Sequence, residues 1–136
     1  MTTDAWTIEL PWPPRKCNPN RRGHWAPKAK AQRAYREACF TQARSAIHRN
    51  GWDVQALREH AEQGGKGSVA LFVDFFPPDR RHRDDDNVAA AFKSGRDGLA
   101  DALGMDDRAF RMHPFLEESP SKGGRVRVRI MPVPHE

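Results

Sequence analysis

The run from Val69 to Phe76, followed at once by Pro77-Pro78, limits the fold more than any other stretch. Its valine, leucine and phenylalanine residues favour a strand in a sheet, and the two prolines end that strand. A charged loop follows, and then a helical pattern from Asp86 to Leu103, which Gly104 stops. The chain is therefore expected to contain a sheet strand that a charged loop connects to a helix.

Other segments show the same two kinds of pattern. Apolar and polar residues alternate from Trp6 to Leu10 and from Arg125 to Met131, which predicts two more strands, and a further strand is expected over about 109–117. Helical spacing is present from Pro27 to about His48 and, more weakly, from Asp53 to Glu62. The order of these elements predicts one α+β domain covering residues 1–136, a small mixed sheet with helices.

The composition indicates a charged surface and excludes several classes of protein. Charged residues make up 30% of the 136 residues and the net charge is +5, which favours nucleic acid as the partner, although a soluble basic protein with no such partner is the alternative. Cys17 and Cys39 are too few for a disulfide framework or a cysteine zinc site. With no apolar leader and no run approaching ~20 apolar residues, we expect a soluble protein of a reducing cytoplasm that has no membrane partner.

An acidic run, Asp84-Asp85-Asp86-Asn87, stands where the charged loop becomes the helix. Carboxylates this close together repel one another unless a cation neutralises them, and hard oxygen ligands suit Mg²⁺ or Mn²⁺. Helix capping is the alternative, because an aspartate at a helix N-terminus is common and stabilising. One cap explains one aspartate, so the run favours a metal site.

Three further features gain meaning only beside this acidic run. Lys93 and Asp97 share a helix face with Asp86. Lys93 leans back toward the aspartates, where it could contact a scissile phosphate. The alternative is that Lys93 pairs with Asp97 or is solvated. Asp106-Asp107 is a second acidic pair, or simply a turn. The basic residues 80–83 would attract phosphates once a bound cation removes the repulsion from the aspartates.

Taken together, these motifs resemble the signature of the RusA family of Holliday-junction resolvases. The resemblance covers about residues 6–132 and is carried by these segments: Leu10-Pro11-Trp12-Pro13-Pro14, Asn18 to Arg21, Arg83-Asp84-Asp85-Asp86-Asn87, Lys93, Asp97-Gly98-Leu99, Asp106-Asp107 and Lys122-Gly123-Gly124-Arg125. It implies a homodimeric α+β nuclease in which Asp84, Asp86 and Asp107 bind the metal and Lys93 is an essential lysine. It implies no ligand role for Asp85 or Asp106.

One spacing departs from the family pattern. Five residues separate Asn87 from Lys93, where the family pattern has two. The three extra residues make nearly one helical turn, so Lys93 keeps its facing but lies ~4.5 Å further along the helix.

The expected activity is Mg²⁺-dependent hydrolysis of a phosphodiester in branched DNA, such as a four-way junction, by a two-fold symmetric dimer; Mn²⁺ is expected to substitute. The alternating Arg125, Arg127 and Arg129 would hold the DNA backbone, or they only line an exposed sheet face. Two other functions stay open: a DNA-binding module without catalysis, and a metal-dependent nuclease acting on RNA or flap DNA.

The helix also raises a question of distance. A straight helix from Asp86 to Leu103 would be ~27 Å long and would leave Asp107 too far from Asp84 in the same chain. Either the helix breaks near Gly95 or Gly98, where glycine weakens it, or Asp107 comes from the partner subunit.

Overall fold

The four predicted strands pair into one mixed sheet in the computed structural model, which describes residues 5–18 and 25–134. The sheet of the described residues has four strands in the order β1-β4-β2-β3. Both β1 and β2 pair antiparallel with β4, whereas β2 pairs parallel with β3. The bounds confirm the predicted strands: β1 Trp6–Pro11, β2 Val69–Phe76, β3 Phe110–Leu116 and β4 Arg125–Pro132.

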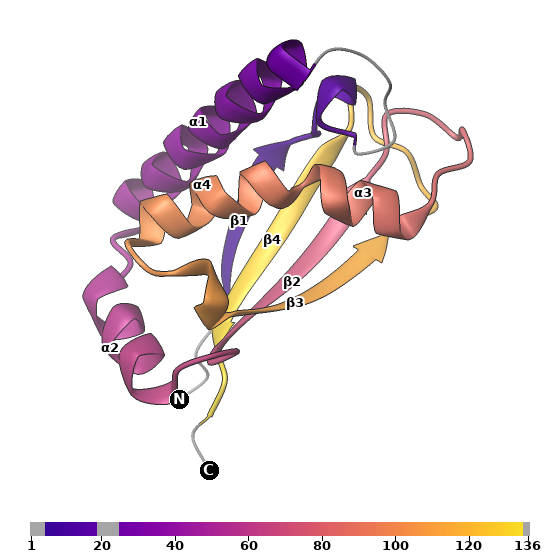
Figure 1. Cartoon of the computed structure of the whole chain (residues 1–136). Helices are drawn as coiled ribbons and strands as arrows, with labels where there is room; N and C mark the ends of the chain where they lie inside the picture. Colours follow the sequence, from indigo (N-terminus) through magenta and orange to yellow (C-terminus); the bar gives the residue numbers. More distant parts are fainter. Residues whose placement is uncertain (1–4, 19–24, 135–136) are drawn as a thin grey trace.

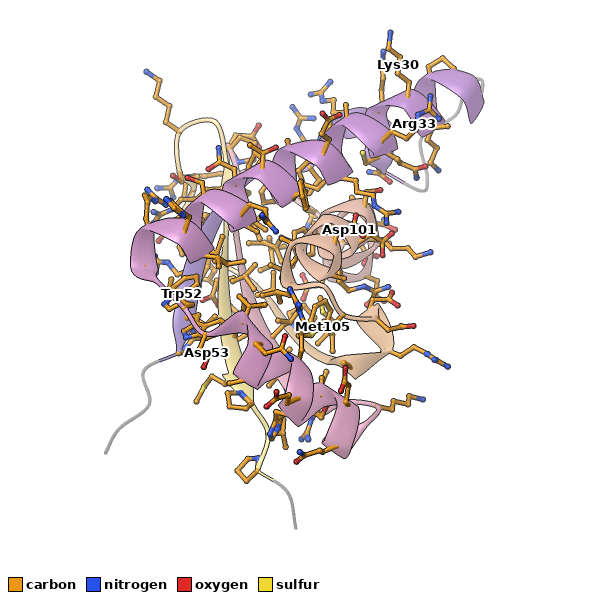
Figure 2. The ribbon with its side chains drawn as sticks, turned by 90° about the vertical axis from the view of Figure 1, so that its left-hand side faces the viewer. Lys30, Arg33, Trp52, Asp53, Asp101 and Met105 are labelled. Carbon is orange, nitrogen blue, oxygen red and sulfur yellow. The ribbon has the colours of Figure 1, made fainter. Side chains whose placement is uncertain are left out.

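Four helices accompany this sheet within the described ranges, so the chain is a small α+β domain. They are α1 Trp25–Asn50, α2 Val54–Gly64, α3 Asp85–Ala91 and α4 Lys93–Leu103. Figure 1 shows α4 and α3 crossing in front of the sheet, and in Figure 2 both lie to one side of it. Part of the predicted loop between Arg15 and Pro27, with the motif residues Asn20 and Arg21, lies outside the described residues. None of the described helices is long and apolar enough to cross a membrane.

Alternation along the strands decides which sheet face is buried. Every second residue of β2, from Val69 to Phe75, is at most 1% exposed, and the matching residues of β1 and β4 are buried beside them. The helices cover this face with the apolar stripes that their spacing predicted. The stripe of α1 consists of Tyr35, Cys39, Ala43, Ala46 and the partly buried Ile47, and that of α3 and α4 of Val88, Phe92, Gly95, Leu99, Ala102 and Leu103.

The predicted helix from Asp86 to Leu103 is two helices with an irregular residue, Phe92, between them. The irregularity is slight. The Phe92 amide still donates to the Val88 carbonyl at 3.2 Å, and its own carbonyl accepts from the Arg96 amide at 3.0 Å. In Figure 1, α3 and α4 accordingly run on in nearly the same direction.

The helix does not break at Gly95 or Gly98, because both glycines are needed for close packing inside α4. A Cβ on Gly95 would lie 2.7 Å from the Phe92 ring and 2.8 Å from the Tyr35 ring, and a Cβ on Gly98 would collide with the Arg36 carbonyl oxygen of α1. The helix is interrupted at Phe92 and runs on through both glycines, so the alternative of a break at Gly95 or Gly98 is not what the structure has. Glycine weakens a helix in isolation, but here it lets α4 pack closely against α1.

Candidate functional site

Asp84 begins α3 as its N-cap. Its Oδ1 accepts a hydrogen bond from the Asp86 amide at 2.9 Å, so capping does account for one carboxylate oxygen of the acidic run. Asp84, Asp85 and Asp86 are all exposed, and their other carboxylate oxygens have no protein partner among the described residues. The alternative of a simple cap therefore explains part of Asp84 and leaves the rest of the run available to a cation.

A hollow of about 620 Å³ lies against Asp84. Segments far apart in the sequence form its walls: the proline-rich turn after β1, the 77–84 loop, the first turns of α3 and the glycine turn before β4. The lining residues are Trp12, Pro13, Pro14, Arg15, Asn18, Pro78, Asp79, Arg81, His82, Arg83, Asp84, Asn87, Val88, Ala91 and Gly123. Cationic and apolar groups thus surround two carboxylates, Asp79, which pairs with Arg83, and Asp84.

Trp12 is the residue on which these segments meet. The Arg83 guanidinium lies over the indole at 5.6 Å from its centroid, and the Phe75 ring meets it edge-on at 6.2 Å. Gly124 approaches from a third side, where a Cβ would come within 2.8 Å of the Trp12 side chain. From α1, the Tyr35 hydroxyl donates to the Pro11 carbonyl at 2.7 Å. The proline-rich motif and the glycine motif therefore build the same wall.

Arg83 shapes the loop that carries the aspartates. It forms an ion pair with Asp79 at 2.9 Å and donates to the Asp79 and Arg81 carbonyls at 3.2 and 2.9 Å. The Asp79 carboxylate in turn accepts the Arg81 amide, and that bond, followed by the bond from Arg83, lowers the pKa of Asp79. Among the basic residues before the acidic run, Arg83 is therefore occupied in building the loop, while Arg81 and His82 stay exposed.

Lys93 is the first residue of α4 and is exposed. It forms no ion pair or hydrogen bond in the described part of the chain, so it does not pair with Asp97. Seven residues along the helix place it ~10 Å beyond Asp86. Its long side chain is available to a ligand, but the structure does not bring it into contact with the aspartates.

Asp107 lies in a different place from the acidic run. It begins the short turn η2 (Asp107–Ala109), and its Oδ2 accepts the Arg96 guanidinium of α4 at 3.2 Å. Its neighbour Asp106 caps η2, accepting the Arg108 amide at 2.9 Å, and this bond is the main cause of the lowered pKa of Asp106. Asp106 is thus the turn residue, whereas Asp107 is held toward α4.

Strand direction explains why Asp107 and Asp84 are apart. β2 and β3 are parallel and pair from Val69–Phe110 to Phe75–Leu116, a length of ~20 Å at 3.3 Å per residue. Asp84 follows the carboxyl end of β2, and Asp107 precedes the amino end of β3. Figure 1 accordingly shows α3 near the carboxyl end of β3 and the turn that precedes β3 at its other end. In the described residues, no three His, Cys, Asp or Glu side chains gather closely enough to hold a metal ion.

The predicted arginine stripe lies on the sheet face opposite the core, but acidic partners neutralise part of it. Glu9 pairs with Arg127 at 3.0 Å and with Arg125 at 3.8 Å, and Asp74 pairs with Arg129 at 3.7 Å. The guanidinium groups also lie over phenylalanine rings of β2, Arg125 over Phe76 at 4.4 Å and Arg129 over Phe72 at 5.3 Å. The paired positions of β1, β4 and β2 fix these contacts, which the sequence of one strand does not reveal.

Sequence reasoning missed two residues of the site. Arg96 holds Asp107, and its signal was weak, because a lone arginine on a helix is usually solvated. Arg15 lines the hollow from η1 (Arg15–Cys17), and only its place directly after the proline-rich motif pointed to it.

Comparison with known proteins gives a relative but no family description. No protein-family model matches the chain. An uncharacterized protein of Xylella fastidiosa (strain Temecula1 / ATCC 700964) is 40% identical over 124 residues, a stretch that covers 91% of this chain and 74% of the Xylella protein. The chain therefore belongs to the same family as this Xylella fastidiosa protein.

Proposed function

We propose that the chain is a RusA-like, Mg²⁺-dependent endodeoxyribonuclease that cuts branched DNA, such as a four-way junction, as a homodimer. One observation carries the proposal. Three of the motifs that resemble the RusA signature, at residues 10–14, 83–87 and 122–125, converge on one basic hollow with Asp84 in its wall. The pairing of Pro11 and Phe76 with Arg125 brings these motifs to one end of the sheet, where they can form a single site.

The donor set at the start of α3 fits a hard cation in part. Asp84 and Asp86 offer exposed carboxylate oxygens without protein partners in the described ranges, and Mg²⁺ is usually bound by one or two carboxylates together with waters and substrate phosphates. The two residues would hold the ion, and Asp107 would supply a third carboxylate from elsewhere. When bound, Mg²⁺ supplies activation of a water molecule and charge stabilisation of the leaving oxygen.

The residues around the aspartates favour an approaching phosphodiester. Arg15 and Arg81 are exposed at the hollow, and such cations attract a phosphate backbone. Lys93, free in the described part of the chain, extends from α4 to contact a phosphate further along the strand. Arg83 acts through the loop: its contacts to Asp79 and Trp12 hold Asp84 against the hollow.

The separation of Asp107 from Asp84 supports a composite site at a dimer interface. In this arrangement a two-fold axis lies beside the edge strand β3 and perpendicular to it. The strands of the partner then run in the opposite direction to those of the first subunit. The end of one subunit that carries Asp107 then lies beside the end of the other that carries Asp84 and Asp86. Such an isologous contact generates two identical sites from two incomplete ones.

The test is nicking of a synthetic four-way junction with and without Mg²⁺, beside duplex, flap and RNA substrates. Asp84→Asn and Asp86→Asn should each slow nicking by more than the roughly 10–100-fold that loss of an outer-shell partner costs. Junction binding should stay intact or tighten, because each change removes a charge that repels phosphate. Asparagine also caps helices well, so the fold should survive at Asp84.

Asp85→Asn is the matched control, since it removes the same charge from the same run at a position with no ligand role. It should nick at close to the wild-type rate. Wild-type nicking by either Asp84→Asn or Asp86→Asn at moderate Mg²⁺ would refute the metal site. Binding without any Mg²⁺-dependent cutting would instead identify a DNA-binding module, and cutting confined to RNA or flaps would identify a different nuclease.

A further inference from the structure

The hollow beside Asp84 is larger than a metal ion and a phosphate require. Its volume of about 620 Å³ compares with roughly 30 Å³ for each molecule of liquid water, and it falls in the range of roughly 300–1,000 Å³ typical of pockets for organic ligands. The hollow therefore has room for a whole organic group next to the position of the phosphate.

The walls of the hollow differ in chemistry from its floor to its rim. Trp12 and the buried Pro13, Val88 and Ala91 provide apolar surface. The half-buried Asn87 carboxamide also lines the hollow, and it has no hydrogen-bond partner among the described residues. An apolar surface with one amide is suited to a flat ring that carries donors and acceptors on its edge.

Exposed basic residues add positive charge to the rim of the hollow. Arg15, Arg81 and His82 are exposed there, and the nearest acid to Arg81 is Asp79 at 3.8 Å, a carboxylate already held by Arg83 at 2.9 Å. Ring-binding surface, an amide and a cationic rim occur together in sites for nucleotides.

We propose that this hollow binds one unpaired nucleotide of the DNA substrate, the nucleotide next to the phosphate held at Asp84. This inference rests on the proposed nuclease function and adds to it a reason for selecting branched DNA. A base in an intact duplex must leave its stack before it can enter the hollow, whereas a nucleotide at a branch point leaves it most readily. The hollow thus favours branched DNA over duplex without reading a base sequence.

The first experiment changes the DNA and leaves the protein intact. After the nick in a four-way junction has been mapped, the nucleotide on either side of it is replaced by an abasic analogue. One of these two replacements should slow nicking by about tenfold or more, since the abasic analogue removes the ring that the apolar wall would bury, and burial of an apolar group of similar size is worth roughly 10- to 150-fold. An abasic site four nucleotides away on the same strand is the control and should change the rate little. Equal rates for the abasic and intact flanking positions overturn the inference while the nuclease function stands.

The second experiment needs binding only and is done in EDTA. A junction with 2-aminopurine at a branch-point nucleotide should become more fluorescent with wild-type protein as the base leaves its stack, and this rise should shrink with Asn87→Ala. Asn50→Ala removes the same amide at the end of α1, away from the lining of the hollow, and should keep the full rise. If the protein cuts no DNA, the proposed nuclease function fails, and the fluorescence measurement still tests whether the hollow binds an unpaired nucleotide. No rise at any branch position with wild-type protein overturns the inference, as does a rise that Asn50→Ala reduces as much as Asn87→Ala.

Discussion

Subunit mixing tests the composite site directly. If the proposed site is correct, Asp84→Asn and Asp107→Asn should each inactivate a homodimer, because every site in it would carry the lesion. In a heterodimer of the two variants, a composite site places both lesions in one site and leaves the other intact. The structure motivates this arrangement, since the parallel pair β2 and β3 holds the two residues beyond opposite ends of a seven-residue pairing, ~20 Å in length.

The expected recovery follows from random pairing. An equal mixture of the two variants, after exchange, contains about half heterodimers, each with one intact site of two, so about one quarter of the wild-type number of sites should return. The assay is the initial rate of junction nicking, with subunits of two sizes so that exchange can be followed on a native gel. The product should be a junction nicked in one strand, because a single intact site cannot make the paired cut.

Asp84→Asn mixed with Asp86→Asn is the matched control. Both lesions lie in the same half of the site, so each site of that heterodimer is damaged and no activity should return. Absence of recovery in the Asp84→Asn and Asp107→Asn mixture, with exchange verified, would refute the composite site. The chain would then have to bring Asp107 to Asp84 by a rearrangement of α3 and α4.

Three further predictions concern binding and stability. Junction affinity should fall at least about tenfold between 50 and 200 mM salt, measured by fluorescence anisotropy, because phosphate contacts release counterions; a flat profile would exclude the basic hollow as the binding face. Gly98→Ala should lower the free energy of unfolding in urea by about 1–3 kcal/mol through overpacking against Arg36, whereas Ser94→Ala on the same helix should change it by less than about 0.5 kcal/mol. Asp101→Asn, which breaks the 2.7 Å ion pair to Arg36, should cost roughly 0.2–1 kcal/mol at pH 7; Asp101 is labelled in Figure 2. The hydrogen bond to Arg36 lowers the pKa of Asp101 in the fold, so this cost should be present above the ordinary aspartate pKa and disappear as the pH falls through the lowered value; a cost that persisted in acid would refute the pairing.

The elements were predictable because they depend on local pattern. The β-favouring residues of Val69–Phe76 and the alternation in Arg125–Met131 require no knowledge of the partner strand, and the helical stripe from Val88 to Leu103 was buried as expected. Gly95 and Gly98 were misjudged for the same reason. Helix propensity is local, but the Tyr35 ring and the Arg36 carbonyl that meet these glycines belong to another helix.

Of the candidate site, the sequence could predict the closeness of Asp84 and Asp86 but not the place of Asp107. Asp84 and Asp86 are two residues apart in the sequence, so their proximity follows from any fold. The place of Asp107 depends on β3 pairing parallel with β2, a long-range choice that no short motif specifies. The neutralising partners of the arginine stripe, Glu9 and Asp74, were missed because they face it from two other strands.

The proposed composite site and the proposed nucleotide-binding hollow favour the same substrate for different physical reasons. A dimer with Asp107 and Asp84 exchanged across a two-fold axis presents two equivalent sites, and a four-way junction presents two equivalent opposed strands. A hollow that accepts one unpaired nucleotide beside each site requires a strand whose base can leave its stack, which a branch point supplies and a duplex resists. A nicked or flapped duplex offers an unpaired nucleotide but no symmetric second strand. Its unpaired nucleotide should bind in the hollow of one site, and the other site of the dimer should then have no strand to cut. Paired cutting should therefore be confined to the symmetric junction, while single nicks extend to any branched DNA that exposes a nucleotide.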